Sequence, residues 1–186
     1  MRIRGLLIAL TVLAALGGGI YWSNKVKKEA EGKPAPGSAP QILKLAEDQF
    51  KRIEIRRTGM EPILIEKSGA GRWEMLSEPK WPVDQDEARS LVTTLATMTS
   101  DRLVEESSSD LAQFGLSTPG TEVAFSLNDG KAYKLLIGDD TPAGGGSFAK
   151  LDGDPRIFTI ASYNRSSVQK TPRDLRDKRR LPFDSD

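Results

Sequence analysis

The chain has 186 residues, with 27 basic and 26 acidic side chains and with neither Cys nor His. The missing Cys excludes disulfides, thiolate metal sites, thiol nucleophiles and a lipid attached to a leader Cys, and the missing His removes the commonest general base and transition-metal ligand. From residue 41 onward, 21 basic side chains stand against 24 acidic ones. Because this part is slightly acidic, we expect no nucleic-acid partner.

A long uncharged stretch near the N-terminus predicts a membrane-inserting helix. Residues 5–24 carry no charge, and a helix of that length spans about 30 Å, the thickness of the hydrocarbon core of a bilayer. Tyr21 and Trp22 stand where an aromatic belt meets the membrane surface. The alternative is a cleaved signal peptide with a cut after Gly17. Because apolar residues continue through Trp22, we favour an uncleaved anchor over residues 1–24.

The short tail before this anchor predicts the side of the membrane on which the rest of the chain lies. Basic residues are nearly balanced on the two sides of the anchor, so charge alone does not decide the orientation. A very short tail ahead of a signal-like helix usually stays in the cytoplasm, and we therefore expect the domain on the extracytoplasmic side of the inner membrane. Residues 25–40 are rich in Pro and Lys and predict a semi-rigid linker. The domain itself is assigned to residues 41–186.

The first part of the domain predicts three strands. Apolar alternation over residues 50–56, 62–66 and 72–76, with turn residues between these segments, is typical of antiparallel strands. Trp73 lies in the third segment and is expected to pack on the sheet.

A helix is predicted to begin at Asp84. Asp84 and Glu87 have the spacing of a capping box, in which each side chain accepts a hydrogen bond from the backbone N–H of the other residue. Acidic residues in a first helical turn, Asp86 among them, more often complement the helix dipole than bind a cation, so we interpret all three as a cap. An apolar face then follows at helical spacing: Ala88, Leu91, Leu95 and Met98.

The second part of the domain predicts a strand, a helical turn and a four-stranded meander. The strand covers residues 102–106, and the turn runs from Asp110 at its N-cap to Gly115 at its end. Residues 162–171 predict a helix, and residues 173–180 a basic amphipathic turn or two. The order of elements indicates an α+β domain, an antiparallel sheet or meander with helices packed on one face. The meander strands are the alternating segments 123–127, 133–137, 147–151 and 156–160.

Three segments carry residue types that could support chemistry. Residues 138–146 are glycine-rich and include Asp139 and Asp140, which could hold a cation or position a water. We favour a hairpin loop whose glycines supply positive φ. Glu105 and Glu106 point to opposite sides of a strand and cannot share one proton, so we interpret them as solvated edge-strand residues. The serines that follow have no histidine to act as a base.

A basic cluster over residues 173–180 could contact anionic lipid headgroups. Asp174 and Asp177 are interleaved with it, and the spacing of Asp174 and Lys178 allows an ion pair on one helix face. We therefore favour a solvated, partly self-paired surface. Together these patterns predict no catalytic, cofactor-binding or metal-binding residues, no enzyme activity, and a binding site that the residues alone do not locate.

Several segments of the domain form a recognisable combination. The most specific are Phe114-Gly115-Leu116-Ser117-Thr118-Pro119 and Arg176-Asp177-Lys178-Arg179. Four others accompany them: Gly71-Arg72-Trp73, Glu78-Pro79, Arg102-Leu103-Val104-Glu105 and Leu136-Ile137-Gly138-Asp139. With this combination, most of residues 45–186 resembles the bacterial domain-of-unknown-function family 4340.

The resemblance implies an N-terminal membrane helix and a β-rich unit that is often repeated. It also implies a gene neighbourhood with ABC-type transporter components similar to those of gliding motility, and it brings no catalytic residues. Larger members continue beyond a Leu-Pro-Phe-Asp segment like the one that starts at Leu181. The chain is therefore interpreted either as a single-unit member or as one repeat unit of a longer protein.

Our leading functional hypothesis is a non-enzymatic, single-pass membrane protein whose extracytoplasmic domain contacts a protein partner, for example subunits of an ABC-type transport system. We expect no cofactor and no small-molecule ligand. The alternative is a module that binds a cell-envelope polymer through aromatic rings such as Trp73 or Trp81. A third hypothesis is a hydrolase that uses Asp139 and Asp140.

Overall fold

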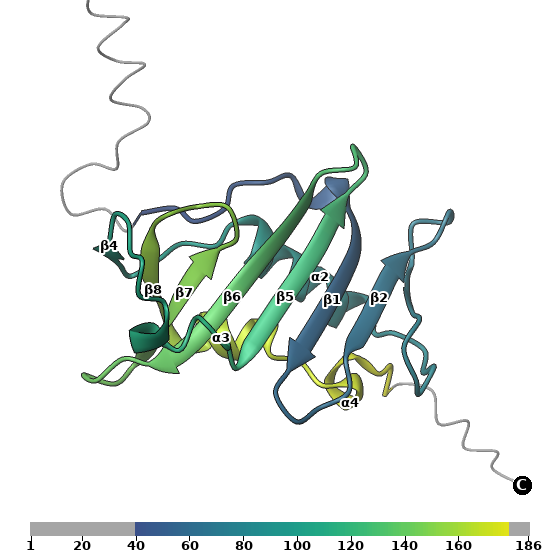
Figure 1. Cartoon of the computed structure of the whole chain (residues 1–186). Coiled ribbons are helices and arrows are strands. Elements are labelled where there is room, and N and C mark those ends of the chain that lie inside the picture. The colour runs from purple at the N-terminus through teal and green to yellow at the C-terminus, as the bar shows by residue number, and fades with distance from the viewer. Residues whose placement is uncertain (1–39, 179–186) are drawn as a thin grey trace, which may run out of the picture. The chain divides into compact units, whose positions relative to one another are not determined.

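The computed structural model describes residues 40–178 (Figure 1). The predicted membrane anchor, all of the predicted linker except Pro40, and the end of the basic C-terminal segment lie outside these residues. Within the described range, no helix combines the length and the apolar character that crossing a bilayer requires.

The described part of the chain is built on one antiparallel sheet of eight strands (Figure 1). The strands are β1 Phe50–Arg57, β2 Ile63–Lys67, β3 Trp73–Met75, β4 Arg102–Glu105, β5 Thr121–Leu127, β6 Ala132–Asp140, β7 Gly146–Leu151 and β8 Ile157–Ala161. They lie in the order β3-β2-β1-β5-β6-β7-β8-β4, so the β1–β3 unit and the β5–β8 meander join where β1 pairs with β5. The predicted antiparallel sheet and its meander are confirmed, and β3 and β4 form the two edges.

The α-helices of the described region lie on one face of the sheet, as predicted (Figure 1). They are α2 Gln85–Ala96, α3 Ser162–Val168 and α4 Pro172–Leu175. Leu91 and Leu95 of α2 are buried against the sheet face on which β5 places Val123, Phe125 and Leu127. Burial of these side chains follows directly from two periodicities, 3.6 residues in the helix and two in the strand. The fold is therefore the predicted α+β class.

The opposite face of the sheet carries a smaller apolar cluster. It forms around η2, a short 3-10 turn at Ala112–Phe114, together with Leu116 and Ile157. The Phe114 ring meets the ring of Phe148 edge-to-face, with 5.0 Å between centroids. The segment around η2 thus covers part of the sheet face that the α-helices leave open.

The cap of α2 is only half of the predicted capping box. The Asp84 carboxylate accepts the backbone N–H groups of Asp86 at 3.0 Å and of Glu87 at 3.4 Å, as predicted. The Asp84 N–H, however, donates to the Leu175 carbonyl at 2.8 Å. The Glu87 carboxylate therefore pairs instead with Lys170, at 3.0 Å, because the chain between α3 and α4 passes beside α2.

Two other predicted helix boundaries were wrong by a few residues. The turn predicted to start from Asp110 has Leu111 at its N-cap, although the Asp110 carboxylate still accepts the Ala112 N–H at 3.1 Å. Gly115 ends the turn with φ 66°, as predicted. The helix predicted over residues 162–171 ends at Val168, and a separate helix begins with a proline at 172, which favours the extended backbone of the residue before it.

Candidate functional site at a sheet edge

The predicted carboxylate pair lies at the end of a strand rather than in a loop. Asp139 and Asp140 are the last residues of β6, and the connection to β7 covers only residues 141–145. Asp140 accepts a hydrogen bond from the Ser147 hydroxyl at 2.8 Å and forms an ion pair with Arg165 of α3. Its charge is thus used to join α3 to the sheet. Among residues 40–178, no three acidic side chains gather closely enough to hold a metal ion.

Two of the segments that carry the family resemblance, residues 114–119 and 136–139, contact each other at β6, and a glycine in each segment makes the contact possible. A Cβ added at Gly138 would lie 2.1 Å from the Phe114 carbonyl oxygen. A Cβ at Gly115, whose φ is positive, would lie 2.5 Å from the Asp139 carboxylate. Side chains do not fit at either position, so these glycines let the segment around η2 lie directly against β6. The two motifs therefore have a packing role.

Glu105 lies in β4, at the edge of the sheet, as predicted. It pairs with Ile157 of β8 after an irregularity in register. This position agrees with its interpretation as an edge-strand residue.

The basic C-terminal segment is attached to the loop that precedes α2. An antiparallel bridge joins Val83 to Arg176. The Arg176 guanidinium lies 5.1 Å from the centre of the Trp81 ring, a cation–π arrangement. The bridge is flanked by two backbone hydrogen bonds, of 2.8 and 2.7 Å: Asp84 N–H to the Leu175 carbonyl and Asp177 N–H to the Pro82 carbonyl. This family-like segment therefore positions Trp81.

The helix α4 that leads into this attachment depends on the Asp174 carboxylate. The carboxylate accepts the Thr171 hydroxyl at 2.7 Å and the Thr171 backbone N–H at 2.8 Å, and the hydroxyl accepts the Asp174 N–H at 3.3 Å. These bonds, the one from the hydroxyl above all, lower the pKa of Asp174 below its ordinary value. The charges of Lys170 and Lys178 act in the same direction, and partial burial opposes them.

The Asp174→Asn variant is expected to lose about 1 kcal/mol of unfolding free energy at pH 7, because the capping box loses the negative charge that strengthens its hydrogen bonds. Because the pKa of Asp174 is lower in the folded chain than in the unfolded chain, where it is about 3.9, the ionised carboxylate stabilises the fold. This stabilisation is complete above the pKa of the unfolded chain and is lost as the pH falls through the pKa of the folded chain. The difference from the wild type should therefore shrink towards pH 2 in urea unfolding followed by tryptophan fluorescence. Asp152→Asn, in the exposed β7–β8 turn, is the control. If the difference in unfolding free energy between Asp174→Asn and wild type stayed the same at low pH, this result would contradict the lowered pKa of Asp174.

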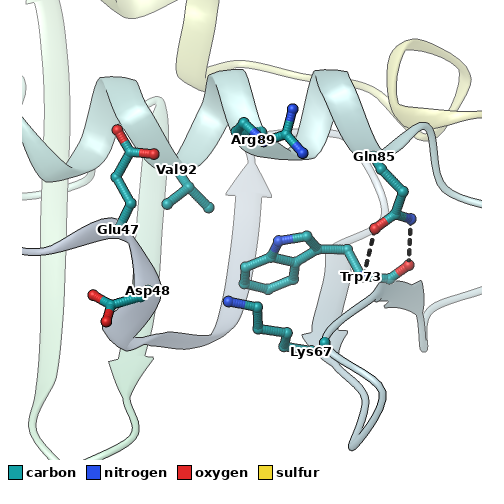
Figure 2. Close-up of a pocket in the computed structure, with 8 residues that line it drawn as sticks. Glu47, Asp48, Lys67, Trp73, Gln85, Arg89 and Val92 are labelled. Atoms are coloured by element: carbon teal, nitrogen blue, oxygen red, sulfur yellow. Dashed lines mark hydrogen bonds between the residues drawn. The ribbon is translucent and has the colours of Figure 1, made fainter.

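A glutamine side chain occupies part of the β3 edge (Figure 2). The Gln85 Oε1 accepts the backbone N–H of Trp73 at 2.8 Å, and its Nε2 donates to the Trp73 carbonyl at 3.0 Å. Nε2 also donates to the Val83 carbonyl at 2.9 Å. A neighbouring strand would contact Trp73 through one N–H and one C=O in the same way. The Gln85 amide therefore takes the place of one peptide group of an added strand.

One groove lies on the α2 side of this contact, and we call it the Trp73 groove. Its volume is about 320 Å³, and it lies between β3, α2 and the 3-10 turn η1 at Glu47–Gln49. Glu47 and Asp48 lie on the side away from Gln85, while Lys67 passes beside the indole (Figure 2). The Lys67 ammonium is 5.9 Å from the ring centre. Because Trp73 is only 7% exposed, it is a wall of this groove and offers no open ring face.

A second groove, the Trp81 groove, lies on the other side of the contact. Its volume is about 340 Å³, and it lies between β3 and the segment 80–83. Its lining combines apolar residues, among them Met75 and Trp81, with charged residues such as Arg72 and Glu74. It is therefore a mixed surface, unlike a small-molecule pocket with an apolar lining.

The backbone of Met75 faces the Trp81 groove. In an antiparallel strand, successive residues direct their N–H and C=O to opposite sides. Trp73 directs its backbone groups outward to Gln85, so Glu74 directs its groups to β2 and Met75 directs its groups outward again. The bond from Leu76 N–H to the Leu64 carbonyl of β2, at 2.8 Å, agrees with this alternation. Among the backbone hydrogen bonds of residues 40–178 that lie outside the strand ladders, none involves the Met75 N–H or C=O.

The sequence predicted that Trp73 packs on the sheet, and this is confirmed. It did not indicate the role of Gln85, which looked like an ordinary polar residue in a first helical turn. No sequence signal marks Met75 either, since only the sheet order shows that β3 is an edge. The residues of this site that the sequence singled out were Trp73 and Trp81, the latter three residues before the predicted helix start at Asp84.

The fold and this edge define an α+β domain on an eight-stranded antiparallel sheet, with a partly unpaired strand at one end. The model of the family described as Domain of unknown function (DUF4340) matches residues 73–186, from the first residue of β3 onward, and the chain belongs to this family. No curated protein and no solved structure matches the chain.

Proposed function

We propose that the chain is a non-enzymatic protein-interaction protein, anchored in the inner membrane by residues 1–24, whose extracytoplasmic domain is accessory to an ABC-type transport system. The observation that carries the interaction role is the β3 edge, where the backbone of Met75 and the ring of Trp81 border one groove. The family resemblance supports the membrane anchor and the transport context. It contributes no residue role.

The use of charged side chains in the fold supports a role without catalysis. Asp140 joins α3 to the sheet through Arg165, Asp174 caps α4, and Asp154 pairs with Arg156 at 2.6 Å. The pKa of Asp154 is lowered, chiefly by the Arg156 hydrogen bond. A carboxyl group that acts as a general acid near neutral pH needs a raised pKa, which is the opposite shift.

The position of Pro40, the last residue of the predicted linker, favours partner contact at the β3 edge. Pro40 is held beside β4, where its carbonyl accepts the backbone N–H of Ser100 at 2.9 Å and the Ser100 hydroxyl at 2.8 Å. Seven spacings of about 4.8 Å between the eight strands place β3 about 34 Å from β4 along the sheet. A domain tethered through Pro40 therefore carries the Trp81 groove at its far end.

The polymer-binding alternative has less support. Trp73 is buried and cannot stack on a sugar ring, and the Trp81 ring has Arg176 over one face. Only the remaining part of Trp81 is open to the groove. A polymer site made of aromatic platforms needs more exposed ring surface than these residues provide.

Purification of the full chain from detergent-solubilised native membranes tests the proposal. We expect a permease or ATPase subunit of a transport system to co-purify at a constant ratio. Recovery of the chain without any such subunit would contradict the proposed function. A protease that leaves the domain intact in spheroplasts, which lack the outer-membrane barrier, and degrades it only after the spheroplasts are broken would contradict its extracytoplasmic location.

A further inference from the structure

We propose that the Trp81 groove binds an extended peptide segment of the partner protein, which pairs with the backbone of Met75 as an added strand at the β3 edge. This inference rests on the proposed function and specifies where the partner binds and in which conformation. An edge strand presents N–H and C=O groups at a fixed spacing, and a second extended chain is the natural complement of that pattern.

The Gln85 amide shows that an amide group can hydrogen-bond to the outer backbone groups of β3. It satisfies the donor and the acceptor of Trp73 at 2.8 and 3.0 Å, as a neighbouring peptide group would. It also limits the length of the edge that remains, because the Trp73 groups are no longer available. The incoming segment therefore exchanges two backbone hydrogen bonds with one residue, Met75.

The side chains around Met75 determine which segment fits. Leu76 follows it on the opposite side of the strand and is 45% exposed, one of few large apolar side chains in the described region with such exposure. Trp81 lines the groove into which the Met75 backbone points. An incoming strand alternates its side chains just as β3 does. The segment thus carries apolar or aromatic residues at successive positions, one against Leu76 and the next against Trp81.

The contact is expected to be weak and reversible. Two backbone hydrogen bonds and two apolar contacts form a surface far below that of a stable protein complex. Such short edge contacts add specificity and local order to a partner that is already held nearby. A shared membrane location would supply that proximity.

The test uses the full chain in detergent micelles and, as the probe, a displayed library of random eight-residue peptides. We expect enriched peptides whose binding is abolished by N-methylation at a single position, the one that donates to the Met75 carbonyl. Hydrogen exchange of the backbone segment that contains Met75 should slow about tenfold or more at saturating peptide. Trp81→Ala should weaken binding about tenfold or more, as substitution of an aromatic anchor does.

Two further variants keep the result independent of folding defects. Leu76→Asp changes an exposed side chain, preserves the fold, and should also weaken the selected peptides about tenfold. Tyr163→Ala changes a side chain that is 67% exposed on α3 and should leave binding unchanged. Unfolding curves of all three variants establish that the proteins are folded.

The proposal is overturned if no peptide is enriched above those that bind empty micelles. It is equally overturned if the selected peptides tolerate both N-methylation and Leu76→Asp. The proposed function is tested separately by co-purification. If a transport subunit is recovered equally well with wild type, Trp81→Ala and Leu76→Asp, the proposed function stands. That result overturns only the proposal that the Trp81 groove binds the partner's peptide segment.

Discussion

The Gly138→Ala variant is expected to lose about 3 kcal/mol of unfolding free energy, because the new methyl group overpacks a rigid contact. Its Cβ would lie 2.1 Å from the Phe114 carbonyl oxygen, a backbone atom that cannot rotate away. Relief requires the segment around η2 to move off β6, which exposes the buried side chains of Phe114 and Leu116. Urea unfolding of the full chain in detergent, followed by tryptophan fluorescence, measures the loss.

Gly120→Ala is the matched control for this substitution. A Cβ at Gly120 meets no atom within 4 Å, and its backbone does not have a positive φ. We expect its unfolding free energy to stay within about 0.5 kcal/mol of wild type. If Gly138→Ala proved as stable as Gly120→Ala, the close approach of η2 to β6 would be wrong.

The Phe50→Ala variant is expected to lose about 4 kcal/mol of unfolding free energy. Phe50 is fully buried at the start of β1, and its ring stacks on Phe125 with 5.1 Å between centroids. Phe125 in turn stacks on Tyr133 at 5.3 Å, so the three rings form a column across β1, β5 and β6. The variant loses apolar burial, leaves a cavity and removes one stacking contact.

Equilibrium unfolding in urea measures this loss, with Tyr163→Ala as the control because that ring is mostly exposed. The control should change the unfolding free energy by no more than about 0.5 kcal/mol. A loss below about 1 kcal/mol for Phe50→Ala would contradict a fully buried ring at this position.

The strands and the main helix follow from local pattern. In β5, every second residue is buried, as the alternation of Val123, Phe125 and Leu127 predicted. In α2, Ala88, Leu91 and Leu95 are buried as their helical spacing predicted. Both patterns arise within one element, so the residues of that element alone are enough to predict them.

Contacts between distant segments were not predictable in the same way. The bond of Glu87 to Lys170 joins residues 83 positions apart and displaced the expected capping box. The need for glycine at 138 depends on the Phe114 carbonyl, which only the folded chain brings close. The glycine-rich run around it was read as a loop for this reason, although its first residues belong to β6.

The candidate site depends even more on tertiary structure. Gln85 belongs to a helix and acts on the backbone of a strand, and the availability of Met75 follows from the sheet order. Neither has a sequence pattern of its own. The membrane anchor over residues 1–24 lies outside the described residues and stays a prediction from the sequence.

Site-specific photo-crosslinking in intact cells tests the central claim most directly. A photoreactive amino acid replaces Trp81 in the full chain, or replaces Tyr163 in a parallel strain as the control position. The account predicts a crosslinked adduct with a membrane-associated protein from position 81 and none from position 163. No adduct from position 81, or equal adducts from both positions, would contradict a partner bound at the β3 edge.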